Sequence, residues 1–136
     1  MYRNEGSFSE YCTRFQDRSM EIRVLMCESA KDLIECQPSC LSVVVAMLKE
    51  RLKDSQWEVR RSAVDSLCNV LNSHFESICE DVVYPLCERV LDKRSEVRKF
   101  AVTGLVNVCV LCVCDCRFCR SIAARTGTAV STWRRV

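Results

Sequence analysis

Residues 50–70, ERLKDSQWEVRRSAVDSLCNV, recur in outline at residues 88–108, ERVLDKRSEVRKFAVTGLVNV. The shared core is Asp-x-x-x-Glu-(Val/Ile)-Arg, and a third copy lies nearer the start of the chain. The three copies begin at Asp17, Asp54 and Asp92, so they are offset by 37 and then 38 residues. A period of this length is typical of a repeat architecture rather than a closed globule. The motif therefore indicates a protein that acts through an extended surface rather than through a catalytic pocket.

Each repeat has the hydrophobic spacing of two helices. Between residues 41 and 52, apolar side chains fall at i, i+3, i+4, i+7 and i+11, which is one face of a helix. A second stripe follows the Asp-containing turn: Val59, Ala63, Val64, Leu67, Cys68, Val70 and Leu71 in the middle copy, and Val97, Ala101, Leu105 and Val108 in the last. We therefore predict an all-α fold, a right-handed α-solenoid of about three antiparallel helix pairs. The pairs are expected at residues 7–36, 39–73 and 77–113.

The charged residues of the motif are expected to shape the turns between paired helices. Each Asp is expected to cap the second helix of its unit, and each Arg to reach the Asp of its own or an adjacent unit. These residues are Asp17 and Arg23, Asp54 and Arg60, and Asp92 and Arg98. Ser-x-x-Glu capping boxes are predicted to start at Ser7, Ser55 and Ser77. Pro85 is expected to bend the first helix of the last unit.

Paired helices at this period, with Asp in the turn and Arg six positions later, resemble HEAT repeats. A narrower likeness is carried by Arg14-Phe15-x-Asp17, Ala30-Lys31, Glu50-Arg51-Leu52-x-Asp54 and Cys87-Glu88-Arg89-Val90-Leu91-Asp92-Lys93. These stretches resemble the cohesin-associated sister-chromatid-cohesion regulators named for precocious dissociation of sisters. The resemblance implies a fragment or truncated product of a long HEAT-repeat protein that binds the kleisin part of the cohesin ring in the nucleus. It transfers no ligand-contacting residue to this chain. A HEAT scaffold of another system, such as a condensin, transport or phosphatase adaptor, is an alternative.

Composition and charge exclude several classes of protein. Hydrophobic residues make up 49% of the chain, enough for a core, and no apolar run is long enough to span a bilayer. Up to Cys116 there are 15 basic and 18 acidic residues, which argues against a nucleic-acid-binding face. Twelve cysteines without a secretory signal favour a reducing compartment, where thiols stay free. The expected partners are proteins, with no direct sequence-specific nucleic-acid contact and no membrane.

The end of the chain departs from the repeat pattern. Residues 1–113 are expected to form the array, and residues 114–136 a poorly ordered tail that is rich in Cys and Arg. One hypothesis is that the sequence after Cys116 derives from an altered reading frame or a splice product. The cysteines Cys109, Cys112, Cys116 and Cys119 have Cys-x-x-Cys spacing, but only three residues separate the two pairs, too few for a zinc ribbon. A structural helix end is the favoured interpretation, and a cysteine-based metal or redox protein is the alternative.

The sequence offers no catalytic constellation. His74 is the single histidine and falls in a polar turn, where a surface role is the ordinary one. Three glycines in total cannot form a phosphate-binding loop, and a catalytic cysteine needs a base and an orienting group. We therefore expect a non-enzymatic protein-binding scaffold without a cofactor or a metal.

Overall fold

The computed structural model describes residues 5–111, and over this range the chain is a succession of helices without a strand. The α-helices are α1 (Glu5–Cys12), α2 (Met20–Cys36), α3 (Leu41–Arg51), α4 (Trp57–Ser73), α5 (Phe75–Glu88) and α6 (Ser95–Leu111). Short 3-10 helices lie between them: η1 (Thr13–Gln16), η2 (Pro38–Cys40) and η3 (Arg89–Leu91). The predicted all-α, HEAT-like fold is confirmed.

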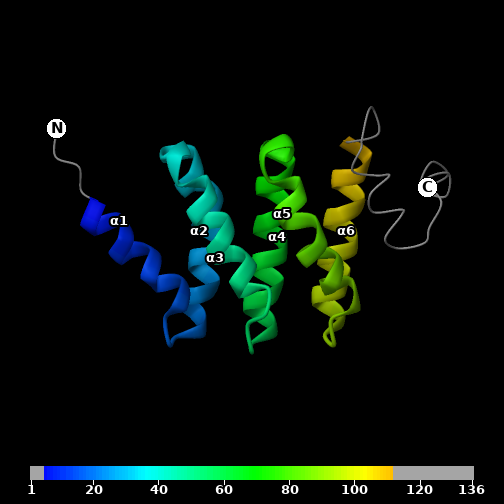
Figure 1. Cartoon of the computed structure of the whole chain (residues 1–136). Helices are drawn as coiled ribbons and strands as arrows, with labels where there is room; N and C mark the ends of the chain where they lie inside the picture. Colours follow the sequence, from blue (N-terminus) through cyan, green and yellow to red (C-terminus); the bar gives the residue numbers. More distant parts are fainter. Residues whose placement is uncertain (1–4, 112–136) are drawn as a thin grey trace.

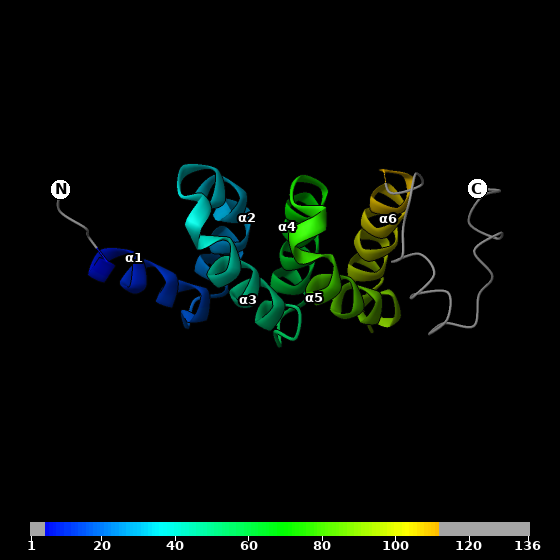
Figure 2. The ribbon, with the colours of Figure 1, turned by 45° about the horizontal axis from the view of Figure 1, so that its top comes forward.

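The helices are arranged in two layers. In Figure 1, α2, α4 and α6 stand side by side, and Figure 2 shows α1, α3 and α5 following one another along a second layer. Helix α4 contacts both α2 and α6, so each helix pair stacks on the next. No pair encloses a core of its own, and the hydrophobic core instead runs through the length of the stack.

Helix α4 is the centre of that core because neighbours cover it on two sides. The seven apolar residues of its predicted stripe are all buried: Val59, Ala63, Val64, Leu67, Cys68, Val70 and Leu71. In α6 the corresponding stripe is buried at Val97, Ala101 and Val108, whereas Leu105 is partly exposed. The helical period of the sequence therefore predicted the inward face correctly, and the end of the array is where burial becomes incomplete.

Small residues let the helices of this layer approach one another. A Cβ atom at position 104 would collide with Sγ of Cys68, so Gly104 permits the close contact between α6 and α4. Ser66 stands one repeat earlier, and its Oγ donates a hydrogen bond of 2.5 Å to the backbone oxygen of Cys27 in α2. The same position thus mediates close contact at both helix interfaces of the layer.

The predicted capping boxes are wrong. Helix α4 has no side-chain cap: Gln56 and not Ser55 directly precedes the helix, and Oδ1 of Asp54 accepts the Gln56 amide at 3.0 Å and shapes the turn. Ser77 lies inside α5, whose cap position is His74, three residues before the predicted cap, and Ser7 lies inside α1, which already includes Glu5. Serine followed by glutamate is common within helices too, so this short signal misplaced the helix starts.

Two further expectations concern Pro85 and the membrane. Pro85 does lie inside α5, and the helix gives way to η3 shortly afterwards.

Within residues 5–111, no helix is long and apolar enough to cross a membrane. The expected tail and the cysteines Cys112, Cys116 and Cys119 lie outside the described residues.

Candidate functional site

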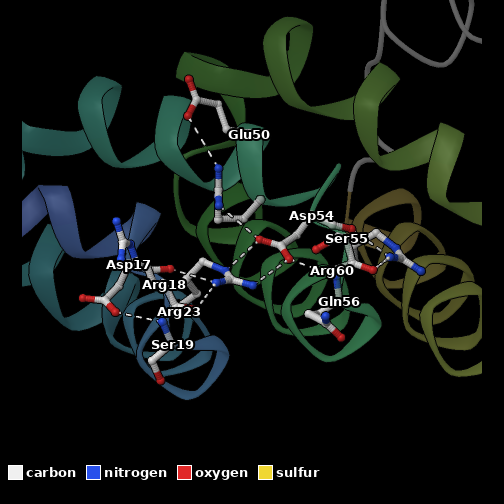
Figure 3. Close-up of polar contacts among 10 residues, drawn as sticks. Asp17, Arg18, Ser19, Arg23, Glu50, Asp54, Ser55, Gln56 and Arg60 are labelled. Carbon is white, nitrogen blue, oxygen red and sulfur yellow. Dashed lines mark hydrogen bonds and ion pairs between the residues drawn. The ribbon is translucent and has the colours of Figure 1, made fainter.

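The repeated Asp and Arg residues form a ladder of ion pairs between successive turns. Arg23 of α2 reaches Asp54 of the next unit, with Nε–Oδ2 and Nη2–Oδ1 distances of 2.9 and 3.1 Å (Figure 3). Arg60 binds Asp92 in the same two-pronged way, at 2.9 and 3.0 Å. Each rung therefore joins one unit to the following unit. Of the two partners that the sequence allowed, the Asp of the adjacent unit is the one bound.

Each motif Arg also holds the turn of its own unit. The Nη1 atoms of Arg23, Arg60 and Arg98 donate to the backbone oxygens of Asp17, Asp54 and Asp92, at 2.8, 2.8 and 2.7 Å. One guanidinium group thus fixes both the local turn and the position of the next unit. The spacing of six residues between Asp and Arg is what brings the side chain back over its own turn.

Each motif Asp accepts a backbone amide two residues ahead. Asp17, Asp54 and Asp92 accept the amides of Ser19, Gln56 and Arg94 at 2.9, 3.0 and 2.9 Å. These three amides belong to the residues that directly precede the second helices. The prediction that Asp caps the helix therefore needs correction: the carboxylate orders the turn before the helix and does not bond to the first amides within it.

A second arginine supports each carboxylate, and sequence reasoning gave it no role. Arg14, Arg51 and Arg89 each lie three residues before the motif Asp and donate to its Oδ2 at 3.1 Å. Nη1 of Arg89 also donates to the backbone oxygen of Leu52, at 3.1 Å, which adds a contact between units. The signal was present, because Arg-x-x-Asp occurs in all three copies.

The second rung, Arg60–Asp92, is a buried ion pair. The side chains of Arg60 and Asp92 are 4% and 2% exposed. Burial acts to raise the pKa of Asp92, but hydrogen bonds from Arg60 and the Arg94 amide, with the charges of Arg60 and Arg89, outweigh it and hold the pKa below its ordinary value. The pKa of Asp17 is also lowered, first by the Ser19 amide and then by Arg14. Both carboxylates therefore stay ionised at neutral pH.

A cluster of arginine and aromatic side chains lies where α4 and α6 begin. The guanidinium of Arg61 lies 5.9 Å from the ring centre of Trp57 and 5.3 Å from that of Phe100. Arg94 lies over Trp57 at 4.4 Å. Cation–π contacts of this kind add to the joint between neighbouring units. No repeat of the motif contains this cluster as a whole, so the pattern could not have revealed it.

The chemistry of these groups is structural. The carboxylates and guanidinium groups of the ladder bind one another and the backbone, so the ladder has no free base beside a nucleophile. Nδ1 of His74 lies 3.3 Å from the backbone oxygen of Val70, at the junction of α4 and α5. Burial raises the pKa values of the Cys27 and Cys68 thiols to about 12, which disfavours the reactive thiolate. Over residues 5–111, no group of three potential ligands could hold a metal ion.

Stacked helix pairs joined by buried Arg–Asp rungs define a HEAT-like repeat protein. Over residues 2–121, the chain matches the family described as sister chromatid cohesion protein PDS5. It therefore belongs to this family of cohesion regulators, and the resemblance noted in the sequence is confirmed. No match emerges from comparison with the curated proteins or with the solved structures.

Proposed function

We propose that this chain is a non-enzymatic, protein-binding scaffold segment of a cohesin-associated regulator and that it acts in the nucleus. The family match over residues 2–121 is the observation that carries the proposal. Proteins of this family act in sister chromatid cohesion, so the partners that we expect are subunits of the cohesin ring. The chain would supply shape and charge complementarity, with no bond made or broken.

The way the structure uses its charges supports a scaffold. The most regular charged residues of the sequence are committed to the ladder, where Arg60 and Asp92 are buried. The two outward layers of helices remain as the surfaces available to a partner. Exposed apolar side chains on the layer of first helices include Val43 of α3 and Tyr84 of α5. On the layer of second helices, Asp65 and Asn69 of α4 are exposed.

The test is affinity capture from nuclear extract with the full chain as bait. Recovery of cohesin subunits above a control resin supports the proposal. Recovery of transport or phosphatase components in their place would favour a HEAT scaffold of another system. The alternative of a cysteine-based metal or redox protein is tested with a variant in which Cys112, Cys114, Cys116 and Cys119 are all serine. If the chain is a scaffold, the wild-type protein should bind no zinc stoichiometrically and the variant should keep its partners. The alternative predicts bound zinc in the wild-type protein and loss of function in the variant.

Matched surface variants can then locate the bound face. Val43→Glu with Tyr84→Glu alters only the layer of first helices, and Asp65→Lys with Asn69→Lys alters only the layer of second helices. All four side chains are exposed, so neither double variant should change the helical content or the melting temperature. A scaffold that uses one face should lose its partner in one double variant and keep it in the other. Unchanged capture by both would place the contact elsewhere.

A further inference from the structure

The two ends of the described array carry the two halves of one missing rung. At the α6 end, Nη1 of Arg98 binds the Asp92 backbone oxygen as in the interior units, but no carboxylate within residues 5–111 meets its Nε or Nη2. At the α2 end, Asp17 binds Arg14 and the Ser19 amide, yet no motif Arg from another unit reaches it in the described structure. The guanidinium and the carboxylate are therefore both held in the geometry that the interior rungs use.

The α6 end also exposes the apolar surface that interior units bury. Val102 is 46% exposed, whereas Val64, which stands at the equivalent position of α4, is 0% exposed. Val106 is likewise exposed, and its equivalent Cys68 is buried against α6. This face is therefore a continuation of the interface that α4 presents to α6, with the covering unit absent from the described residues.

A hollow of about 440 Å³ lies beside Arg98 on this face. It is lined by Val90, Ser95, Arg98, Lys99, Val102 and Thr103. The hollow thus combines an arginine with unfilled donors, a second cation and apolar walls. A carboxylate on a helix turn has the charge and the size that such a site would accept.

The α2 end exposes apolar side chains at positions that are buried in α4, where the neighbouring helix covers them. Leu25 is 62% exposed, whereas the equivalent Ser62 of α4 is 6% exposed. Ile22 is exposed as well, and its equivalent Val59 is fully buried. Together with Asp17, these side chains form the surface that α4 and Asp54 present to α2 and Arg23 in the interior.

We infer that the α6 end of one chain binds the α2 end of a second copy. In this contact, Arg98 forms a rung with Asp17 of the second chain, while Val102 and Val106 pack against Ile22 and Leu25. The contact joins two different surfaces, so it leaves a free end on each side. Head-to-tail contacts of this kind build open chains of copies rather than closed dimers.

The primary test is the concentration dependence of assembly, measured by sedimentation velocity on the full chain. Wild-type protein should grow past the dimer as its concentration rises. Arg98→Met removes the rung between the two copies and should weaken their association about 10- to 100-fold, as expected for a charge-assisted bidentate contact. A monomer at all concentrations, or growth that stops at a dimer, would overturn the inference.

Two blocking variants test the head-to-tail geometry. Leu25→Lys blocks the α2 end and leaves the α6 end intact, whereas Val102→Lys does the reverse. Each variant alone should be monomeric, with the melting temperature of wild-type protein diluted to the monomer, because both side chains are exposed in the single chain. An equal mixture should form one-to-one dimers and nothing larger. A mixture that stays monomeric refutes the pairing. If both variants still associate, and this association is lost when residues 112–136 are removed, the contact belongs to that segment instead and the inference is wrong.

Discussion

The change Arg60→Met tests the idea that one buried ion pair holds neighbouring units together. Methionine keeps an apolar stem of similar reach but removes all donors of the guanidinium group. The substitution therefore breaks the two bonds to Asp92 and the bonds to the backbone oxygens of Asp54 and Ser55. Asp92 is left as a buried carboxylate that is supported only by Arg89 and the Arg94 amide.

The expected cost follows from this burial. Removing one partner of a buried ion pair costs about 3–5 kcal/mol, because the other charge remains without its counter-ion. Since Arg89 still neutralises part of the Asp92 charge, we expect the lower value, about 3 kcal/mol. For a domain of this size, that corresponds to a fall of roughly 10–20 °C in the melting temperature.

The assay is thermal and urea unfolding at pH 7, followed by circular dichroism, with Arg98→Met as the matched control. Arg98 makes the same bond to its own turn but forms no rung within the described residues, so at a dilution where the protein is monomeric this variant should lose only about 1 kcal/mol. The double variant Arg60→Met with Asp92→Asn should cost less than the sum of the two single variants. Equal destabilisation by Arg60→Met and Arg98→Met would show that the rung is not what joins the units.

Three more predictions follow from packing, burial and charge. Gly104→Ala should destabilise the protein by about 1 kcal/mol, because the new Cβ would collide with Sγ of Cys68. Most of this cost should disappear when Cys68 is already Ala, because only the Cβ of residue 68, at 3.0 Å, then remains close. A double-mutant cycle of urea unfolding measures this coupling, and equal costs in the two backgrounds would contradict the contact. In timed alkylation read by mass spectrometry, exposed Cys36 should react well before buried Cys27, whose thiol pKa is about 12, and equal rates in the folded protein would contradict this order. Because the pKa of Asp92 is lowered on folding, its contribution to stability is complete above its unfolded pKa and is lost as the pH falls through its folded pKa. The difference in unfolding free energy between wild type and Asp92→Asn should therefore be constant above about pH 5 and shrink below about pH 4. A difference that grows in acid would refute the lowered pKa.

The hydrophobic period carried most of the information about the fold. Leu67 and Val64 are buried because they recur at helical spacing, and a helix needs only such a stripe to define its inward face. Helix starts were harder, because Ser55 and Asp54 are both suitable side chains for a helix start, and the sequence does not say that Asp54 would accept the Gln56 amide and leave Ser55 without a capping bond. Ser77 illustrates the same limit, since the Ser-x-x-Glu pattern is also compatible with the interior of a helix.

The direction of the ladder could not be predicted from one sequence. Arg60 stands six residues after Asp54 and 32 residues before Asp92, and both carboxylates are chemically suitable partners. Only the stacking of the helices decides between them. Burial at the ends is a similar case: Val64 and Val102 have the same residue type and the same place in the pattern, yet one is covered and the other is not. What differs is the neighbour, which a local pattern does not contain.

The ladder also makes the middle unit a cassette for protein engineering. Arg23 and Asp54 are 31 residues apart, and Arg60 and Asp92 are 32 residues apart, so stacked units form a rung at either separation. If residues 38–74 were duplicated in tandem, Arg60 of the first copy would stand 31 residues before Asp54 of the second. The Arg60 of the second copy would still precede Asp92 by 32 residues. Residue 66 of the second copy would meet Cys68 of the first copy where Gly104 stands now, so it should be changed to Gly. With that change the chain should accept whole units of its own sequence, and its length could be set by the number of cassettes inserted.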